Sequence, residues 1–381
     1  MPPFFGRYGM RKVVAWIHRY LGLSLGGLLL ISGLTGSIIV FNKDIDATLN
    51  AGLFQVQPRE ARRSIDDILQ NVRAAVPFKD AGFVFLPQSP DLALEVWFRD
   101  TDLRAYADPY TGELLGTRNA KSSLMGFLVD LHIHLLSGET GERVVGWAGL
   151  GGIVVSALGL WLWWPKRGRW KQALQIKWEA APGRLWLDVH KLVGALTFVL
   201  FVLTATTGAA LALYELITEP VLIALTGEGA RKSAPKSRSS SGAAAPVSPM
   251  LDQAALLFPG AQITRITLPA KPNAAVAVRM RLEGEIHQFG RTFIWFDQYD
   301  GSVLRVDNAL LANRATRIQS WLYPLHTGVY GGLATRLLQV MVGLSLSLLT
   351  LSGAWLWYRS YSARSNAAKR LKALKTLPER M

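Results

Sequence analysis

The chain has 381 residues, half of them hydrophobic, and a formal net charge of +15. It contains no cysteine, which excludes disulfides, covalently attached haem, cysteine-ligated iron–sulfur clusters and thiol catalysis. Any redox cofactor must therefore be held non-covalently by other side chains.

The apolar residues are concentrated in four uncharged stretches, each with the roughly 20 residues that a helix needs to cross a membrane. These stretches are Leu21–Phe41, Val144–Trp164, Leu192–Tyr214 and Leu337–Tyr358. The first is too long for a cleaved signal peptide and has no small-residue cleavage site before Phe41, so we interpret it as a retained span. The sequence therefore predicts an α-helical membrane protein with a four-helix transmembrane bundle.

The excess of positive charge lies beside these spans. The two termini and the loop at 165–191 hold 18 basic residues and only three acidic ones. Because basic residues next to spans mark the cytoplasmic side, we expect both termini and this loop inside the cell, with residues 42–143 and 215–336 outside. The expected location is the inner membrane of a bacterium. The charge reports topology and contact with anionic lipid, and nucleic acid is not expected as a partner.

The two halves of the chain resemble each other. His18 and Gly22 in the first span match His190 and Gly194 in the third, and each pair is followed at the same distance by Thr-Gly. Matching glycines in the second and fourth spans are Gly149 and Gly159 with Gly343 and Gly353. Since both halves begin inside the cell, the repeats are parallel, and a pseudo-twofold axis normal to the membrane would place equivalent residues at one depth.

Each outside region carries signals for one helix and several strands. Ser64 can cap a helix over Ile65–Val76, and Ser248 before Pro249 can cap one over Met250–Phe258. The expected strands are Gly82–Leu86, Leu92–Arg99 and Leu103–Ala107, then Gln262–Leu268, Ala275–Leu282 and Thr292–Phe296, with a Gly-closed turn and a further strand in each copy. Each half is therefore predicted as a span, an α+β domain and a second span.

Five of the six histidines lie at or beside spans. We expect His18 and His190 near the cytoplasmic ends of the first and third spans, and His134 and His326 near the outer ends of the second and fourth. Under the pseudo-twofold axis each pair can place two imidazoles across a gap, which is a suitable clamp for haem iron. His287 is predicted on the surface of the second outside domain.

Basic residues beside these histidines can pair with haem propionates. The candidates are Arg19, Lys191, Arg143 and Arg336. Each feature also has a structural interpretation, because interfacial histidines anchor helices, glycines pack helices together, and cations set orientation. His132 and His134 lie about 200° apart on a helix and cannot both point inward. The repeat alignment favours His134.

Aromatic residues have two expected roles. Tryptophans at the ends of the second and fourth spans are expected to form an interfacial belt, namely Trp161, Trp163, Trp164, Trp355 and Trp357. Aromatic residues of the outside domains can line a docking surface, although most are expected in the core: Trp97, Phe98, Tyr106, Tyr110, Phe293, Trp295 and Tyr299.

With these motifs the chain resembles the PepSY-associated transmembrane family over nearly its full length. The matching motifs are His-Arg-Tyr-Leu-Gly from His18, Leu-His-Ile-His-Leu-Leu-Ser-Gly from Leu131, and Pro-Leu-His-Thr-Gly from Pro324. The resemblance is closest to the inner-membrane siderophore reductases of the ferrioxamine type. It implies haem b, two per chain, and reduction of a ferric siderophore of the hydroxamate type in the periplasm. The family frame before the second span implies His132 as ligand, so the choice between His132 and His134 stays open.

The spans, the charge distribution and the internal repeat predict an order of domains, and the resemblance implies that the two outside domains are PepSY-like. The expected parts are the N-terminus and first span (1–41), a first periplasmic PepSY-like domain (42–123), a helix and second span (124–165), a cytoplasmic loop (166–185), the third span (186–217), a second periplasmic PepSY-like domain (218–313) with a flexible linker (226–249), the fourth span with its preceding segment (314–360), and a cytoplasmic tail (361–381).

We therefore expect a haem-containing reductase that passes electrons across the membrane. The expected path begins at a haem held by His18 and His190 and continues to one held by His326 with His134 or His132. No flavin or nicotinamide motif is present, so the unidentified electron donor is a separate protein, a quinol or a soluble reductant. The alternatives are a non-enzymatic module that binds a partner and a siderophore permease, which the uncharged spans disfavour.

Overall fold

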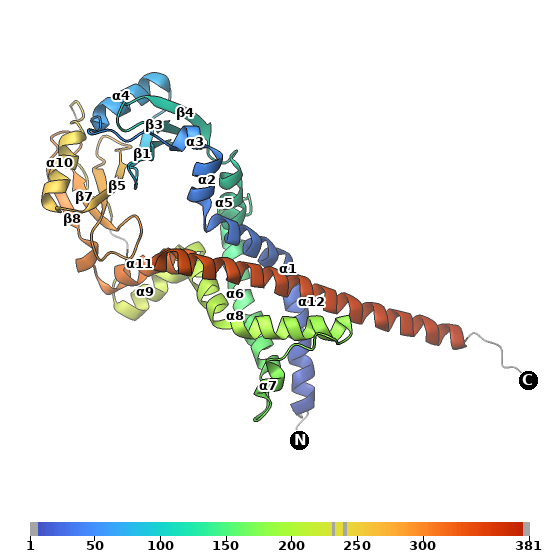
Figure 1. Ribbon diagram of the computed structural model, residues 1–381. Helices are drawn as coiled ribbons and strands as arrows, with labels where there is room; N and C mark the ends of the chain where they lie inside the picture. The colour runs from blue at the N-terminus through green and yellow to red at the C-terminus, as the bar shows by residue number, and fades with distance from the viewer. Residues whose placement is uncertain (1–6, 231–232, 239–241, 376–381) are drawn as a thin grey trace, which may run out of the picture. The chain divides into compact units, whose positions relative to one another are not determined.

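A computed structural model of the chain describes residues 7–230, 233–238 and 242–375 (Figure 1). The chain divides into two compact units. The helical unit contains the chain up to Val40, His132–Leu213 and the chain from Leu337 onward. The sheet unit contains Phe41–Leu131 and Tyr214–Arg336.

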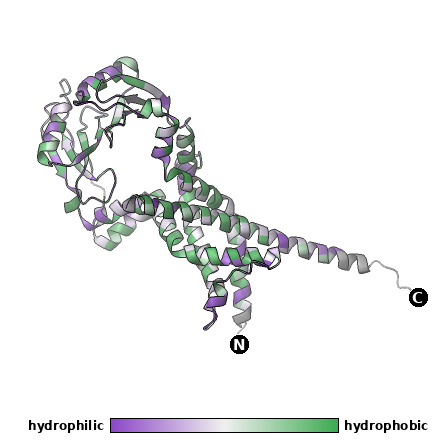
Figure 2. Cartoon of the chain, viewed as in Figure 1, coloured by the Kyte–Doolittle hydropathy of each residue, from purple (hydrophilic) through white to green (hydrophobic). Residues whose placement is uncertain are grey.

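Four long helices make up most of the helical unit. They are α1 (Arg7–Ile39), α6 (Gly138–Trp163), α8 (Pro182–Ala212) and α12 (Gly332–Lys375). All four are long and apolar enough to cross a membrane, and Figure 2 shows apolar residues predominating along them. The four predicted spans are thus confirmed, and the chain is a membrane protein. The helices continue past the apolar stretches because Lys and Arg are good helix formers and helical geometry does not require apolar side chains.

Small residues allow the helices of this unit to approach closely. A Cβ added to Gly33 of α1 would lie 2.7 Å from the carbonyl oxygen of Gly343 in α12. A Cβ added to Gly149 of α6 would lie 3.5 Å from the carbonyl oxygen of Ala205 in α8. Such close backbone approach provides the van der Waals packing that joins helices in lipid, where apolar side chains gain little by meeting each other.

The sheet unit contains one eight-stranded antiparallel sheet in the order β4-β3-β2-β1-β5-β6-β7-β8. Its strands are β1 (Ala81–Phe85), β2 (Leu94–Phe98), β3 (Leu103–Ala107), β4 (Leu114–Asn119), β5 (Gln262–Thr267), β6 (Val276–Arg281), β7 (Thr292–Phe296) and β8 (Val303–Asp307). The sequence predicts two separate α+β domains. In the structure their strands pair edge to edge through β1 and β5, so each copy closes one open edge of the other.

Two helices cover one face of this sheet (Figure 1). Helix α4 (Ile65–Ala75) and helix α10 (Ser248–Leu257) pack on alternate residues of the strands, and Val84, Ile266 and Ile294 on that face are fully buried. The predicted cap of α4 is confirmed, because the Ser64 side chain accepts a hydrogen bond from the Asp67 amide at 3.1 Å.

The predicted cap of α10 is wrong. Ser248 is the first residue of the helix, and the amides of Val247 and Ser248 donate to the Asp66 carboxylate of α4 at 2.8 and 2.9 Å. Burial raises the pKa of Asp66, but these hydrogen bonds outweigh burial and lower the pKa below its ordinary value. A carboxylate of the first copy therefore satisfies helix amides of the second copy, where a negative charge is also favoured by the helix dipole.

Shorter helices complete the chain. They are α2 (Asn42–Leu49), α3 (Ala51–Phe54), α5 (Leu124–His134), α7 (Trp170–Ala173), α9 (Glu219–Thr226) and α11 (Arg314–Thr327), with single turns at Tyr214–Thr218, Ala309–Leu311 and Val329–Gly331. Arg118 of β4 forms a bidentate ion pair with Asp46 of α2. Within the linker predicted at 226–249, residues 231–232 and 239–241 lie outside the described residues, while Lys236 pairs with Ala274 and Ser237 accepts from the Gln298 amide.

Replacing Asp66 by Asn should lower the free energy of unfolding of the sheet unit by about 1 kcal/mol, the usual value of a helix cap. The native pKa of Asp66 lies below its unfolded value, so this contribution is present at neutral pH and is lost as the pH falls below about 4. Chemical unfolding of the full chain in detergent, followed by tryptophan fluorescence, measures both effects. The exposed neighbour Asp67→Asn is the control, and equal midpoints for the two variants would contradict the role of Asp66.

Candidate functional site

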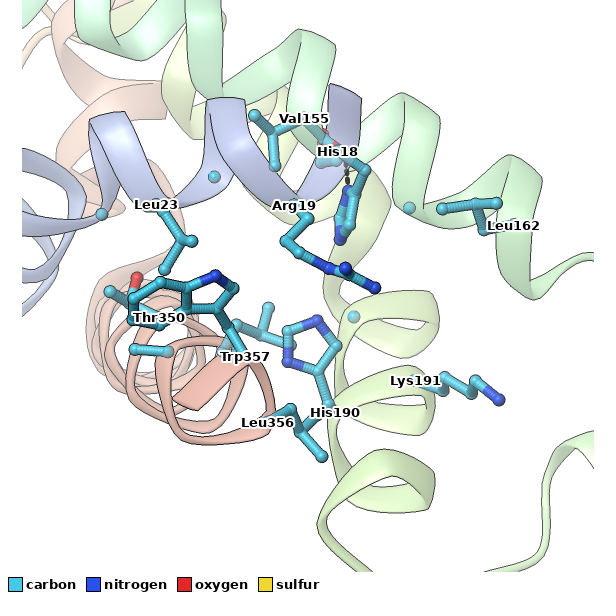
Figure 3. A pocket seen from close by; sticks show the side chains of 18 of the residues that line it. His18, Arg19, Leu23, Val155, Leu162, His190, Lys191, Thr350, Leu356 and Trp357 are labelled. Carbon is cyan, nitrogen blue, oxygen red and sulfur yellow. Dashed lines mark hydrogen bonds between the residues drawn. The ribbon is translucent and has the colours of Figure 1, made fainter. Parts of the chain in front are cut away.

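His18 and His190 lie together in a cavity within the helical unit. They project from α1 and α8 toward the same space (Figure 3), and their ring centroids are 6.3 Å apart with an interplanar angle of 83°. The cavity has a volume of about 790 Å³ and is lined by residues of α1, α6, α8 and α12. This volume is in the range typical of cofactor sites, about 300–1,000 Å³.

Each imidazole is fixed through its Nδ1 atom. His18 Nδ1 lies 3.0 Å from the carbonyl oxygen of Val155, which can only accept, so this nitrogen carries the proton. His190 Nδ1 lies 2.9 Å from the Ser352 hydroxyl, whose own proton is donated to the Leu349 carbonyl oxygen. The hydroxyl oxygen therefore accepts from His190 Nδ1. Both Nε2 atoms are left unprotonated, as metal ligands must be.

Glycines on the neighbouring helices leave space for each imidazole ring. A Cβ added to Gly159 of α6 would lie 2.9 Å from His18 Cε1, and one added to Gly353 of α12 would lie 3.3 Å from His190 Cε1. These two glycines match in the sequence alignment of the halves. The match of the spans is visible in the sequence, but only packing between helices shows that these glycines make room for the two histidine rings.

Three cations line the same cavity: Arg19, Lys191 and Arg359. Arg19 and Lys191 are predicted from the sequence, whereas Arg359 is not; its guanidinium packs against Gly183, where a Cβ would lie 3.0 Å from it. Figure 3 shows Lys191 extending away from the space between the imidazoles. None of the described residues that line the cavity is acidic. The cavity therefore offers a mostly apolar wall with positive charge and two free imidazole nitrogens.

Two tryptophans expected in the interfacial belt also line this cavity. Trp163 and Trp357 are among its wall residues, and Figure 3 shows the Trp357 indole beside Leu23 and Thr350. The interfacial belt stays a prediction for these two residues, which lie where one side of α6 and of α12 faces the other helices of the bundle. Large flat rings on the wall suit a flat apolar occupant.

The donor set does not suit a bare metal ion. Within residues 7–230, 233–238 and 242–375, no group of three or more His, Cys, Asp or Glu side chains could hold one. Protein sites for zinc use three or four such ligands. Two imidazoles suffice only where another molecule supplies the remaining ligands, as the nitrogen atoms of a porphyrin do.

His132 has the same kind of environment as His190. Its Nδ1 lies 3.0 Å from the Thr35 hydroxyl, which donates its own proton to the Ile31 carbonyl oxygen at 2.6 Å. A Cβ added to Gly36 would lie 2.9 Å from His132 Cε1. His134 is half-buried two residues later at the end of α5. The Thr-Gly pair noted in the sequence thus provides a hydrogen-bond acceptor and space for the ring of His132.

The remaining predicted site residues are divided between the two units. His326 lies on α11 of the sheet unit, whereas His132 and His134 belong to the helical unit. The pairing of His326 with His134 or His132 therefore stays a prediction. Arg143 is exposed and forms an ion pair with Glu139 one turn earlier. Arg336 forms an ion pair with Asp44, and its guanidinium lies 4.0 Å from the centroid of the Phe41 ring.

His287 is buried, contrary to the surface position predicted from the sequence. It is 8% exposed, its ring stacks on Tyr323 of α11 at 5.4 Å, and its Nδ1 lies 3.3 Å from an Arg279 nitrogen. Burial and the positive charges of Arg279, Arg291 and Arg281 lower the pKa of His287 to about 3. Its imidazole is therefore neutral at physiological pH.

The fold and this site define a four-helix membrane protein with paired imidazoles in an apolar cavity and a large antiparallel sheet outside the bundle. The sequence matches the PepSY-associated TM region over residues 15–360, and the chain belongs to this family. No curated protein matches the chain.

Replacing His287 by Gln should make the free energy of unfolding fall less steeply as the pH is lowered. The native pKa of about 3 lies below the unfolded value, so the unfolded chain binds one more proton between pH 6.5 and 3. Stability is therefore lost as the pH falls through this window, by at most about 1.4 kcal/mol per pH unit, and the variant lacks that loss. Urea unfolding of the full chain at several pH values tests this, and parallel curves for the two proteins would refute it.

Proposed function

We propose that the protein is a haem-containing inner-membrane reductase that passes electrons to a ferric siderophore in the periplasm, where iron is released. The observation that carries the proposal is the pair of imidazoles, His18 and His190, facing one cavity with both Nε2 atoms free. Membership of the PepSY-associated TM family is compatible with this function and does not by itself imply it.

The distance between the imidazoles would allow both His18 and His190 to hold one haem iron. An imidazole nitrogen binds a metal at about 2 Å and lies about 1 Å from the centre of its ring, so two rings sharing a metal have centroids roughly 6 Å apart. The observed separation is 6.3 Å. The glycines Gly22, Gly26 and Gly194 in the wall leave space for a flat macrocycle between the helices.

The cations of the cavity suit the two propionates of haem b. Arg19 and Arg359 would pair with them, since a guanidinium binds a carboxylate in a bidentate manner. We place this end of the bundle at the cytoplasmic surface, because it adjoins the basic segments that mark the inside. Both chain termini are then cytoplasmic.

A second haem would be held near the periplasmic surface by His326 and a histidine before α6. We assign His132 to this role rather than His134, because Thr35 and Gly36 hold the His132 ring as Ser352 and Gly353 hold that of His190. The pseudo-twofold relation between the halves supports the pairing with His326. The predicted propionate partners there, Arg143 and Arg336, already have carboxylate partners.

Haem supplies reversible one-electron chemistry when bound. The chain's residues hold the iron ligands in one tautomer, exclude water from the cavity and counter the propionate charge. The overall reaction transfers one electron from a quinol or a soluble reduced carrier to Fe(III) in the chelate and yields Fe(II). Siderophores bind ferrous iron far more weakly, so reduction releases the metal without breaking a covalent bond of the chelator.

Replacing His18 or His190 by Ala should remove one of the two haems. The purified wild-type chain should show a Soret band that shifts on reduction with dithionite and reverts on addition of ferric siderophore, and pyridine-haem analysis should give two haems per chain. Each variant should give one, whereas His287→Gln, which removes a histidine from the sheet unit, should keep both. A colourless wild-type preparation from haem-replete cells would instead support a non-enzymatic membrane module, and uptake of intact chelate by vesicles a permease.

Replacing Gly159 by Ala should reduce occupancy of the inner haem, because the added methyl group would lie 2.9 Å from His18 Cε1 and must displace the ring. Alanine is favoured over glycine in a helix by about 1 kcal/mol, so loss of haem could not be attributed to a weakened α6. Gly9→Ala is the matched control, since nothing lies within 4 Å of its added Cβ. Equal haem content in the two variants would contradict the role of Gly159.

A further inference from the structure

The face of the sheet opposite α4 and α10 carries arginines paired with aromatic rings. In the first half of the sheet, Arg104 lies directly across from Trp97, with its guanidinium 3.8 Å from a ring centroid of that side chain. At the junction of the two halves, Arg265 of β5 lies across from Phe85 of β1, at 5.9 Å. Arg265 also lies 5.2 Å from the centroid of Phe83.

The second half of the sheet repeats this arrangement. Arg279 lies across from Phe293 at 5.6 Å, and Arg305 lies across from Trp295 at 5.4 Å. Four arginine–aromatic pairs therefore stand on the strand positions that alternate with the buried core. We call this surface the arginine–aromatic face.

The arginines on this face differ in how their charge is satisfied. Arg305 forms an ion pair with Asp307 at 2.8 Å, and Arg279 donates to the Gly290 carbonyl oxygen at 2.8 Å. Arg265 has no carboxylate within ion-pair distance among the described residues, and its buried Nε atom has no hydrogen-bond partner there. Burial lowers the pKa of Arg265, which is the sign of a guanidinium held away from water without a counter-ion.

The face has a net positive charge. The acidic residues on the strand positions of this face are Glu95, which accepts from the Trp97 indole at 3.0 Å, and Asp307. Against these two stand the four paired arginines. A half-buried cation that lacks a hydrogen-bond acceptor carries a cost in free energy, and an anion bound there would remove this cost. The surface is thus complementary to a ligand that combines negative charge with aromatic rings.

We propose that the arginine–aromatic face binds a ferric chelate of the catecholate type, with Arg265 as the central anchor; this rests on the proposed function. Three catecholates carry six negative charges and leave a ferric complex at minus three, with aryl rings on its outer surface. Three hydroxamates only neutralise the charge of the ferric ion, so their complex is uncharged, and a hydroxamate need not contain an aryl ring. The residues on this face therefore favour a different chelate from the hydroxamate that the family resemblance implies.

The test uses gallium(III) complexes, because gallium matches ferric iron in charge and size but is not reduced. Isothermal titration of the full chain in detergent should show the tris-catecholate complex of 2,3-dihydroxybenzoate binding at least ten-fold more tightly than a gallium trihydroxamate. Arg265→Gln should weaken catecholate binding at least ten-fold. Arg73→Gln, which removes an exposed arginine of α4 on the covered side of the sheet, should leave it unchanged. Binding should also weaken as salt is raised.

Equal affinity for the two complexes, or an unchanged affinity in Arg265→Gln, would overturn the proposal. If circular dichroism shows that Arg265→Gln has lost the sheet, Arg104→Gln is tested instead, and its affinity for the gallium catecholate should be at least five-fold weaker than that of the wild type. The readout does not depend on haem or on electron transfer. A chain that binds the gallium catecholate but lacks haem would refute the reductase and leave this site standing, whereas one that reduces ferric trihydroxamate without preferring the catecholate would refute this site alone.

Discussion

An imidazole inside an apolar helix bundle needs an acceptor for its N–H group and room for its ring, and the helical unit depends on both. His18 and His190 obtain them from the neighbouring helix, through Val155 and Ser352, beside glycines that leave the helix backbone uncovered. Because these contacts fix the tautomer, the nitrogen that faces the cavity is the basic one. The cavity can then be apolar and still present two strong ligands, which an unsupported histidine in lipid could not do.

A feature of the fold or the site can be predicted from the sequence only where residues close together in the chain determine it. The four spans follow from length and hydropathy alone, and His18 with His190 follow from one repeated motif. Arg359 and the wall position of Trp357 do not, because which side of a helix faces the bundle depends on packing between helices. His287 is predicted at the surface, whereas in the structure Tyr323, distant in sequence, stacks on its ring and the side chain is buried.

The sheet illustrates the same limit at a larger scale. Each copy has a helix, alternating strands and Gly-closed turns that the sequence predicts, yet alone each would leave an unpaired edge strand at the junction. Pairing of β1 with β5 removes one edge from each copy, and the Asp66 carboxylate extends the junction to the helix layer. Neither contact has a local signal, since Asp66 looks like an ordinary acid in the first turn of its own helix. Duplicated modules that share an edge are thus more strongly joined than their separate sequence patterns indicate.

The distribution of charge follows from this junction. Outside the three basic flanking segments the acids and bases of the chain balance, so composition alone assigns the net charge to membrane topology. The acidic and basic residues balance only when whole domains are counted, because acids such as Asp66 lie on the helix layer and arginines lie on the opposite face of the sheet. Edge pairing places Arg265 between the arginines of both copies, where their fields add over a continuous surface. The part of the chain outside the basic flanking segments is therefore neutral in composition but has one positive face. A bound anion interacts with the electric field at that face rather than with the net charge of the chain.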